Sequence, residues 1–146
     1  MSARMIDLVL GTVALMGLSD EKYIRVTTFK KDGTEVSTPT WVVPLEDGKI
    51  GFYTSSASGK AKRLKNNPNV IVQPSDARGR VKSGTLPVKG TAVVVAGNER
   101  DAIYERVVAK YGVMTKITRF LSKVGGFIKR NKQPYADRGV VVTLAD

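Results

Sequence analysis

The chain has 146 residues, 42% of them hydrophobic, and 24 Lys or Arg residues against 13 Asp or Glu give a formal net charge of +11. This length and apolar fraction predict a single globular domain that spans residues 1–146. The sequence contains neither Cys nor His, which excludes disulfides, thiolate nucleophiles, imidazole bases and the usual zinc sites. Any catalysis must therefore rely on carboxylates, Lys, Tyr, hydroxyls or a bound cofactor, and we expect no metal.

The positive charge predicts an acidic partner: nucleic acid, an anionic membrane surface or a polyanionic small molecule. A basic surface that only keeps the protein in solution has the same composition. Charge alone leaves these alternatives open.

The N-terminal segment superficially resembles a signal peptide, because Arg4 precedes the apolar run LVLGTVALMGL. Asp7 interrupts the start of this run, no small-x-small cleavage site follows, and the run is too short to span a bilayer. Its apolar residues recur at helical spacing, at Ile6, Val9, Leu10 and Val13. We therefore expect a helix packed on the domain and a cytoplasmic protein.

Strands dominate the first half of the chain. Alternating, β-branched and aromatic residues predict strands at 23–30, 35–43 and 49–54, separated by turns at Asp32-Gly33 and 46–48. Pro39 places the second strand at a sheet edge or a bulge, because proline cannot donate to a ladder.

A short helix comes next, capped by Ser58 or a neighbour, running through Lys60 to Lys65 and ending before Pro68. Apolar runs predict strands at 69–74 and 86–97, with a bulge at Gly90, and the basic segment between them, ARGRVKSGT, is expected to be a mobile loop.

In the last third of the chain, Asn98 is expected to cap a helix that ends before Gly112. A second helix is expected through Ile117, Phe120, Leu121 and Val124, and RGVVVTLA closes the chain as a sixth strand. The elements together predict an antiparallel α+β fold, a small six-stranded β-barrel with peripheral helices.

The stretch YTSSASGKAKRLKNNP, residues 53–68, carries the strongest chemical signal. Its small residues offer hydroxyl and backbone N–H groups to an anion ahead of a helix start, at Ser55, Ser56 and Ser58, and Gly59 permits close approach. Lys60 and Arg63 share one helix face and are the phosphate candidates. Lys62 and Lys65 are expected to face solvent. A solvated basic helix would look similar, so both interpretations stand.

A longer run, GFYTSSASGKAKRLKNNPNVIV, resembles the flavin-phosphate segment of pyridoxamine 5′-phosphate oxidase and its split-barrel relatives. In that family, a strand ending in Phe-Tyr-Thr leads to a Ser-Arg-Lys stretch, a helix ending in Asn-Pro and an apolar strand. The upstream hairpin TTFKKDGTEVSTPTWVV is similar to the actinobacterial branch that uses flavins or the deazaflavin coenzyme F420. The resemblance covers residues 22–97 and implies a split β-barrel of the FMN-binding type.

The resemblance also implies which residues hold the cofactor. It places the ring against 38–41, the ribityl chain and phosphate beside Tyr53 and Thr54, and a phosphate contact on Lys60. The family arginine before that lysine is Gly59 here, so Arg63 or Lys62 is expected to replace it. The full expected set is Thr38, Pro39, Thr40, Trp41, Tyr53, Thr54, Ser55, Ser56, Lys60, Arg63 and, by position only, Gln73. For Trp41, core packing remains an equal alternative.

The function that the resemblance implies is hydride transfer carried by the cofactor, with no catalytic side chain, in a homodimer with sites at the subunit interface. We expect reduced F420 rather than FMN, because its acidic tail suits a basic chain and the cations Lys62, Arg78, Arg80 and Lys82. The expected substrate is an unsaturated or electron-poor small molecule. The C-terminal substrate pattern of the true oxidase is not recognisable, so pyridoxamine phosphate oxidation is not expected.

Three alternatives remain: an FMN-dependent oxidoreductase, a non-catalytic flavin or haem carrier, and a nucleic-acid or membrane-surface module. Membrane binding would use the basic segment 116–132. Nucleic-acid binding is not expected, because the aromatic residues are few and scattered.

Overall fold

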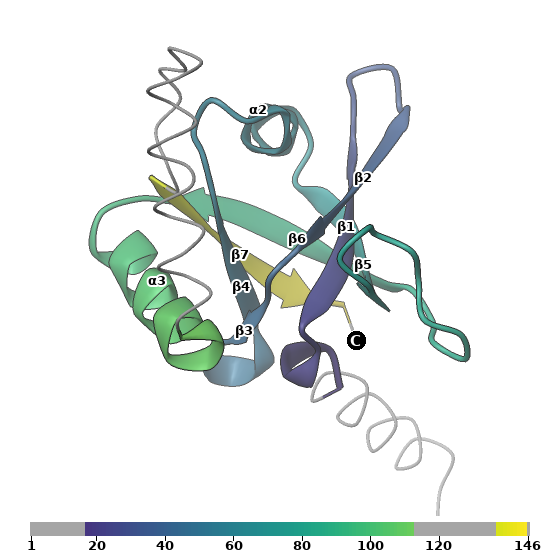
Figure 1. Ribbon diagram of the computed structural model, residues 1–146. Helices are drawn as coiled ribbons and strands as arrows, with labels where there is room; N and C mark the ends of the chain where they lie inside the picture. The colour runs from purple at the N-terminus through teal and green to yellow at the C-terminus, as the bar shows by residue number, and fades with distance from the viewer. Residues whose placement is uncertain (1–16, 113–136, 146) are drawn as a thin grey trace, which may run out of the picture.

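The computed structural model describes residues 17–112 and 137–145. Within them, an antiparallel 7-stranded sheet of order β2-β1-β5-β6-β7-β4-β3 curls into a half-barrel (Figure 1). The strands are β1 (Tyr23–Phe29), β2 (Glu35–Thr40), β3 (Val43–Pro44), β4 (Ile50–Thr54), β5 (Asn69–Ser75), β6 (Val88–Val95) and β7 (Arg138–Leu144). The strands are joined by the 3-10 turn η1 (Glu46–Gly48) and by the helices α2 (Gly59–Asn66) and α3 (Asn98–Tyr111).

The antiparallel split-barrel fold is confirmed, but the expected strand count of six is wrong. The predicted strand 35–43 breaks after Thr40, and Val43–Pro44 pairs with β4 instead of β1. At the break the chain has a distant partner. The backbone N–H of Val42 donates to the hydroxyl of Tyr111 on α3, 3.0 Å away, so this residue finds its partner outside the sheet. Pro39 lies in edge strand β2, as expected.

The helix caps are partly as predicted. Ser58 caps α2, accepting a hydrogen bond from the N–H of Ala61 at 3.1 Å, and Gly112 ends α3. Asn98 is the first helical residue rather than the N-cap, which is Gly97 at a φ of 63°. A glycine adopts this left-handed conformation without the strain that a side chain would add.

Gly90 is not at a bulge. It pairs in continuous register with Val70 on β5 and Leu144 on β7. A glycine is needed at this position because the backbone of β7 packs closely against it: a Cβ there would lie 2.8 Å from the carbonyl oxygen of Thr143.

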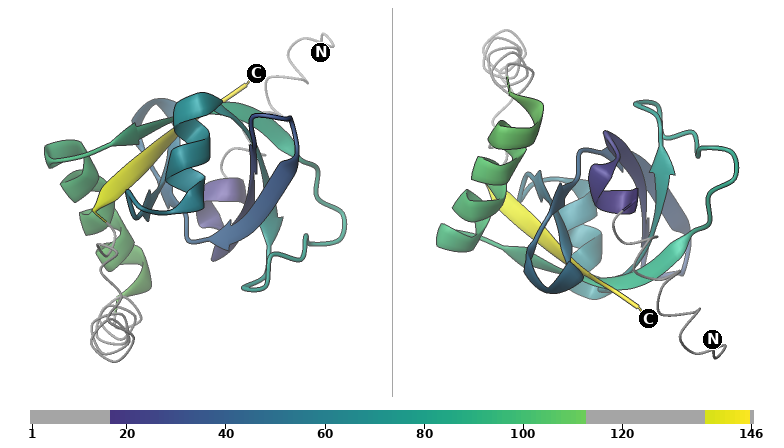
Figure 2. Two further views of the ribbon diagram at one scale, coloured as in Figure 1. Left: turned by 90° about the horizontal axis from the view of Figure 1, so that it is seen from above. Right: turned by 90° about the horizontal axis from the view of Figure 1, so that it is seen from below.

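Two hydrophobic clusters stabilise the fold, one on each side of the sheet. The inner cluster fills the half-barrel, and α2 lies across its opening and contributes Leu64 (Figure 2). The outer cluster joins the sheet to α3 and is formed by Val43, Ile103, Val107 and Tyr111, with Trp41 and Tyr53 packed against it.

The helices expected at 6–16 and 117–124, and the basic segment 116–132, lie outside the described residues. Among the helices that the structure describes, none has the length and hydropathy needed to cross a membrane.

Candidate functional site

The hydroxyl groups before α2 are already engaged inside the protein. The hydroxyl of Ser58 lies 3.0 Å from that of Thr54, and Ser55 Oγ accepts from the N–H of Ala57 at 3.2 Å. These contacts shape the turn that starts the helix. They leave the three side chains less available to a ligand than the sequence suggests.

Ser56 has a partner that no local sequence pattern predicts. Its N–H and its hydroxyl both donate to the carboxylate of Asp137, each at 2.7 Å. Burial raises the pKa of Asp137, but the hydrogen bonds from Ser56 and the charge of Arg138 outweigh this and hold the pKa below its usual range. The predicted phosphate contact of Ser56 therefore competes with an internal carboxylate.

Lys60 and Arg63 lie together on the face of α2 that meets the barrel. The Lys60 ammonium is 5.1 Å from the ring centroid of Phe52, and Arg63 Nε donates to Thr28 Oγ1 at 2.6 Å. Burial, assisted by the charge of Arg63, lowers the pKa of Lys60 to about 8. Neither cation pairs with a carboxylate of the described residues. Two adjacent, partly desolvated cations without a counter-charge favour the binding of an anion.

The backbone at the start of α2 adds to this cationic pair. In the part of the chain that the structure describes, the N–H groups of Gly59 and Lys60 have no acceptor. They point out of the helix N-terminus, where the helix dipole also favours negative charge. Lys62 and Lys65, by contrast, are exposed, as predicted.

A recess of about 200 Å³ forms a second part of the site, lined by Tyr23, Pro39, Thr40, Trp41 and Tyr53. Four of these residues were predicted as cofactor contacts. Tyr23 was missed, although it precedes Ile24, which pairs with Thr40 across β1 and β2. The recess is smaller than the usual range of about 300–1,000 Å³ for small-molecule pockets, so the described residues of one chain enclose only part of such a ligand.

Trp41 takes both roles that the sequence left open. It packs in the outer cluster, where its ring lies 4.4 Å from that of Tyr111, nearly parallel at 10°. Its ring also meets Tyr53 edge-on at 6.1 Å, and both residues line the recess. The wall of the recess is therefore part of the aromatic packing under α3.

Two larger hollows lie elsewhere. One, of about 520 Å³, is lined by residues that include Phe29, Glu35 and Lys89. The other, of about 470 Å³, lies beside Arg106 and Lys110. Neither hollow is lined by a predicted cofactor residue. We therefore place the candidate site at α2 and β2, because the unpaired cations and the aromatic recess lie there, although the other hollows are larger.

Thr38 carries an unsatisfied polar atom between the two parts of the site. It pairs with Val26 on the core face of the sheet, and its Oγ1 is buried without a hydrogen-bond partner among the described residues. A buried hydroxyl without a partner costs free energy, so a ligand oxygen or nitrogen that reaches it would gain a favourable contact.

The cationic pair and the recess lie toward opposite ends of the β1–β2 pair. Thr28, which holds Arg63, pairs with Val36, whereas Thr40 in the recess pairs with Ile24. The two positions are four residues apart along the strand, about 13 Å. Because β2 is an edge strand, an extended ligand lying along its free edge could contact both parts.

Gln73 does not line the recess. Its amide Nε2 donates to the carbonyl and the hydroxyl of Thr85, at 3.1 and 3.2 Å, and so fastens the loop 76–87 to β5. The same loop approaches the recess at another point, since a Cβ on Gly79 would be 3.4 Å from Pro39 Cδ. A contact between Gln73 and a cofactor stays a prediction.

The residues expected to hold an acidic tail are split between two places. Arg78 and Arg80 flank Gly79 in the loop near Pro39, whereas Lys62 lies on α2, and the two elements stand apart in Figures 1 and 2. Arg80 is paired with Asp76 at 2.7 Å. The backbone N–H of Arg78 also donates to Asp76, at 2.9 Å, but its exposed guanidinium has no carboxylate partner among the residues described. Lys82 is ion-paired with Glu21.

No group of three or more Asp or Glu residues within 17–112 and 137–145 has an arrangement that suits a metal ion.

The fold and the site define a split-barrel protein with cations at one end of its edge strand and an aromatic recess at the other. The family model described as pyridoxamine 5′-phosphate oxidase matches residues 14–141, and the chain belongs to this family. No curated protein is significantly similar to it in sequence.

Solved structures with the same fold include an F420 reductase, with a TM-score of 0.57 and 19% identity over 89% of this chain and 92% of that one. A pyridoxamine 5′-phosphate oxidase-related, FMN-binding protein from Nostoc punctiforme has a TM-score of 0.54 and 13% identity, over 97% of this chain and 80% of that one. A haem-binding protein from Mycobacterium smegmatis has a TM-score of 0.51 and 15% identity, over 90% of this chain but only 48% of that one. At these identities the likeness shows the fold alone.

Proposed function

We propose that the protein is an oxidoreductase that binds reduced F420 and uses it to transfer hydride to an unsaturated or electron-poor small molecule. The observation that carries the proposal is the pair Lys60 and Arg63, two adjacent cations with no carboxylate partner in the described chain. An anionic ligand would relieve their mutual repulsion.

The residues present fit a cofactor with a phosphate at one end and a flat ring at the other. Lys60, Arg63 and the free N–H groups at the start of α2 would hold the phosphate. Pro39, Trp41 and Tyr53 would contact the ring, and the unpartnered hydroxyl of Thr38 would reach a polar atom between them.

When bound, such a cofactor supplies the hydride, which agrees with a chain that has neither His nor Cys. The protein's own residues would orient the ring and exclude water from one side of it. Tyr23 and Tyr53 are the phenols that line the recess, and either could deliver the proton that accompanies hydride transfer.

We propose F420 ahead of FMN because the net charge of +11 and the exposed Arg78 suit a more acidic ligand. The F420 reductase among the similar folds supports this choice, and the FMN-binding relative supports the alternative. Haem is a weaker candidate despite the haem-binding relative, because the chain lacks the His and Cys ligands that most often hold haem iron.

We also propose that a second copy of the chain completes the site. A recess of about 200 Å³ leaves much of a cofactor ring uncovered, and a partner chain packed over β2 would enclose it. Sedimentation should then show a dimer at the concentrations at which cofactor binds.

The test is a titration of the purified protein with F420 and with FMN, followed by deazaflavin fluorescence and by flavin absorbance. We expect F420 to bind more tightly, and the double substitution Lys60→Ala, Arg63→Ala to weaken both cofactors. Tighter binding of FMN would overturn the choice of cofactor. If neither binds, the proposal is wrong and a nucleic-acid or membrane-surface module becomes the better interpretation.

A further inference from the structure

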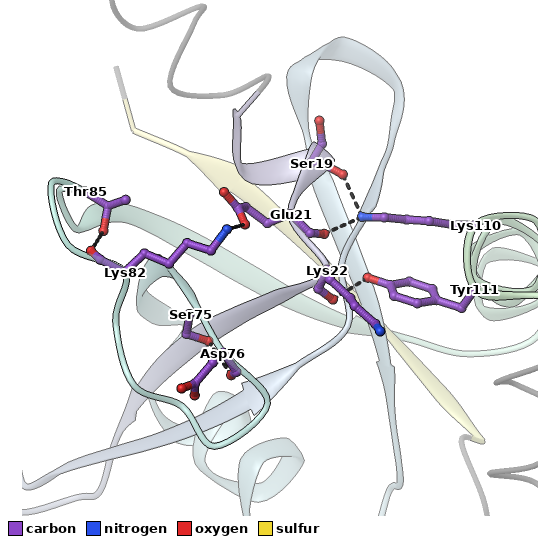
Figure 3. Close-up of polar contacts among 9 residues, drawn as sticks. All are labelled: Ser19, Glu21, Lys22, Ser75, Asp76, Lys82, Thr85, Lys110 and Tyr111. Carbon is purple, nitrogen blue, oxygen red and sulfur yellow. Dashed lines mark hydrogen bonds and ion pairs between the residues drawn. The ribbon is translucent and has the colours of Figure 1, made fainter.

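The last two residues of α3 fasten this helix to the strands that form the recess. The Lys110 ammonium donates to three backbone carbonyls, those of Ser19 at 2.8 Å, Glu21 at 2.6 Å and Val42 at 2.7 Å; Figure 3 shows the first two. Three carbonyl acceptors satisfy all the donors of one ammonium group. Lys110 therefore ties α3 to the segment before β1 and to the segment after β2.

Tyr111 makes a second set of contacts at the same place. Its hydroxyl donates to the carbonyl of Lys22 at 2.7 Å (Figure 3) and accepts from the N–H of Val42 at 3.0 Å. Because Val42 follows Trp41 directly, the phenol holds the backbone at the point where the chain leaves β2. Tyr111 is buried, with 8% of its surface exposed, so this geometry is shielded from water.

The Tyr111 ring also supports Trp41 directly. The two rings are stacked, 4.4 Å apart and 10° from parallel, and Trp41 lines the recess together with Tyr53. Tyr111 thus supports Trp41 in two ways: its ring stacks on the Trp41 ring, and its hydroxyl holds the backbone of the next residue, Val42. No other residue of the aromatic cluster (Trp41, Tyr53, Tyr104 and Tyr111) has a described contact of both kinds with Trp41.

We propose that Tyr111, held in place by Lys110, is a positioning residue that fixes the plane of Trp41 in the wall of the recess and so sets how tightly a planar ring binds there. The inference rests on the function proposed above, because it takes the recess as the place of the cofactor ring. It adds a residue on α3, outside the sequence motifs, to those that determine cofactor affinity.

The chain offers a direct readout, because Trp41 is its only tryptophan. Tyr111→Leu removes the stack, and we expect acrylamide to quench Trp41 emission about twofold more strongly and F420 affinity to fall about three- to tenfold. Tyr111→Phe keeps the ring and should give a smaller change in both. Val107→Ala is the control, since it loosens the packing of α3 but leaves both rings in place.

The outcomes separate this inference from the proposed function. Failure of the unaltered protein to bind F420 or FMN would overturn both. If it binds F420 and Tyr111→Leu binds it equally well, or if Val107→Ala weakens binding as much as Tyr111→Leu does, Tyr111 is only a structural residue. Should Tyr111→Leu not fold, Lys110→Met gives a second test, because it removes the contacts that hold Tyr111 in place while both rings stay in the chain. Stronger quenching with weaker F420 binding is again the expected result, and no change in either would contradict the inference.

Discussion

The guanidinium of Arg63 lies over Gly59, so closely that a Cβ on Gly59 would be 2.7 Å from Arg63 Nη1. The same guanidinium is held from the other side by Thr28 Oγ1, 2.6 Å from Nε. The resemblance noted in the sequence implies an arginine at the position of Gly59. Here the missing side chain leaves room for an arginine that starts one helical turn later, and a guanidinium still lies beside Lys60.

Gly59→Ala tests this exchange. The new methyl group should displace the guanidinium, which is the flexible end of its side chain, and weaken F420 binding about three- to tenfold through the loss of a charged contact. The melting temperature should change little, because the better helix propensity of alanine offsets the weakened contact between Arg63 and Thr28. Lys65→Ala, an exposed change on the same helix, is the control. Equal F420 affinities for the Gly59→Ala and unaltered proteins would show that Arg63 does not contact the cofactor.

Lys60→Ala should weaken cofactor binding about tenfold or more while the fold is retained. The ammonium, the free N–H groups and the helix dipole all act on one phosphate, and a hydrogen bond to a charged group contributes roughly 1.5–3 kcal/mol. The matched control is Lys65→Ala, an exposed lysine near the end of the same helix. Fluorescence titrations in which the two variants behave alike and both bind normally would make α2 a well-capped surface helix and nothing more.

Local sequence patterns were sufficient for what depends on neighbouring residues. The i, i+3 spacing of Lys60 and Arg63 placed both on one face, and Ser58 was identified as a cap because capping depends on the next three residues. The misses in the strand count and in the contacts of Ser56 depend on distant partners. The N–H of Val42 donates to the hydroxyl of Tyr111, 69 positions away, instead of to a neighbouring strand, and Ser56 donates to the carboxylate of Asp137, 81 positions away. No periodicity in the sequence records such contacts.

The lowered pKa of Lys60 predicts a pH dependence of stability. Burial lowers this pKa from 10.5 to about 8 in the folded protein. Between these values the unfolded chain holds the proton and the folded protein does not, so without a ligand the free energy of unfolding should rise with pH across this window. Denaturant melts of the unaltered protein and of Lys60→Met measure the difference, and identical pH profiles would contradict the assignment.

The same group should take up a proton when an anion binds. A phosphate beside Lys60 stabilises its charged form and raises the pKa, so at about pH 9 cofactor binding should be accompanied by proton uptake. Calorimetry in two buffers with different ionisation enthalpies measures the uptake. Lys60→Met should abolish it, whereas an unchanged uptake in this variant would place the titrating group elsewhere.

Thr38→Val should leave stability unchanged or slightly higher and weaken cofactor binding. The buried hydroxyl of Thr38 has no partner among the described residues, so its removal loses no described hydrogen bond in the free protein. The neighbouring Ser37→Ala is the contrast: its hydroxyl lies 2.7 Å from that of the buried Thr27, and its loss should cost about 1 kcal/mol. A thermal melt separates the two variants. If Thr38→Val loses as much stability as Ser37→Ala, its hydroxyl has a partner in the protein and is not reserved for a ligand.

Arg78→Ala should reduce the salt dependence of F420 binding more than Arg80→Ala does. Both side chains are exposed in the loop beside Pro39, but the guanidinium of Arg80 is ion-paired with Asp76 at 2.7 Å, whereas the guanidinium of Arg78 has no carboxylate partner among the described residues. An acidic tail that reaches this loop would interact mainly with Arg78, and added salt would screen that attraction.

FMN, which has no such tail, is the control ligand: its affinity should depend less on salt in the unaltered protein, and neither variant should change that dependence. Affinities measured from low to high salt decide the matter: equal slopes for F420 and FMN would remove the argument from net charge, and the preference for F420 would then have no support in this loop.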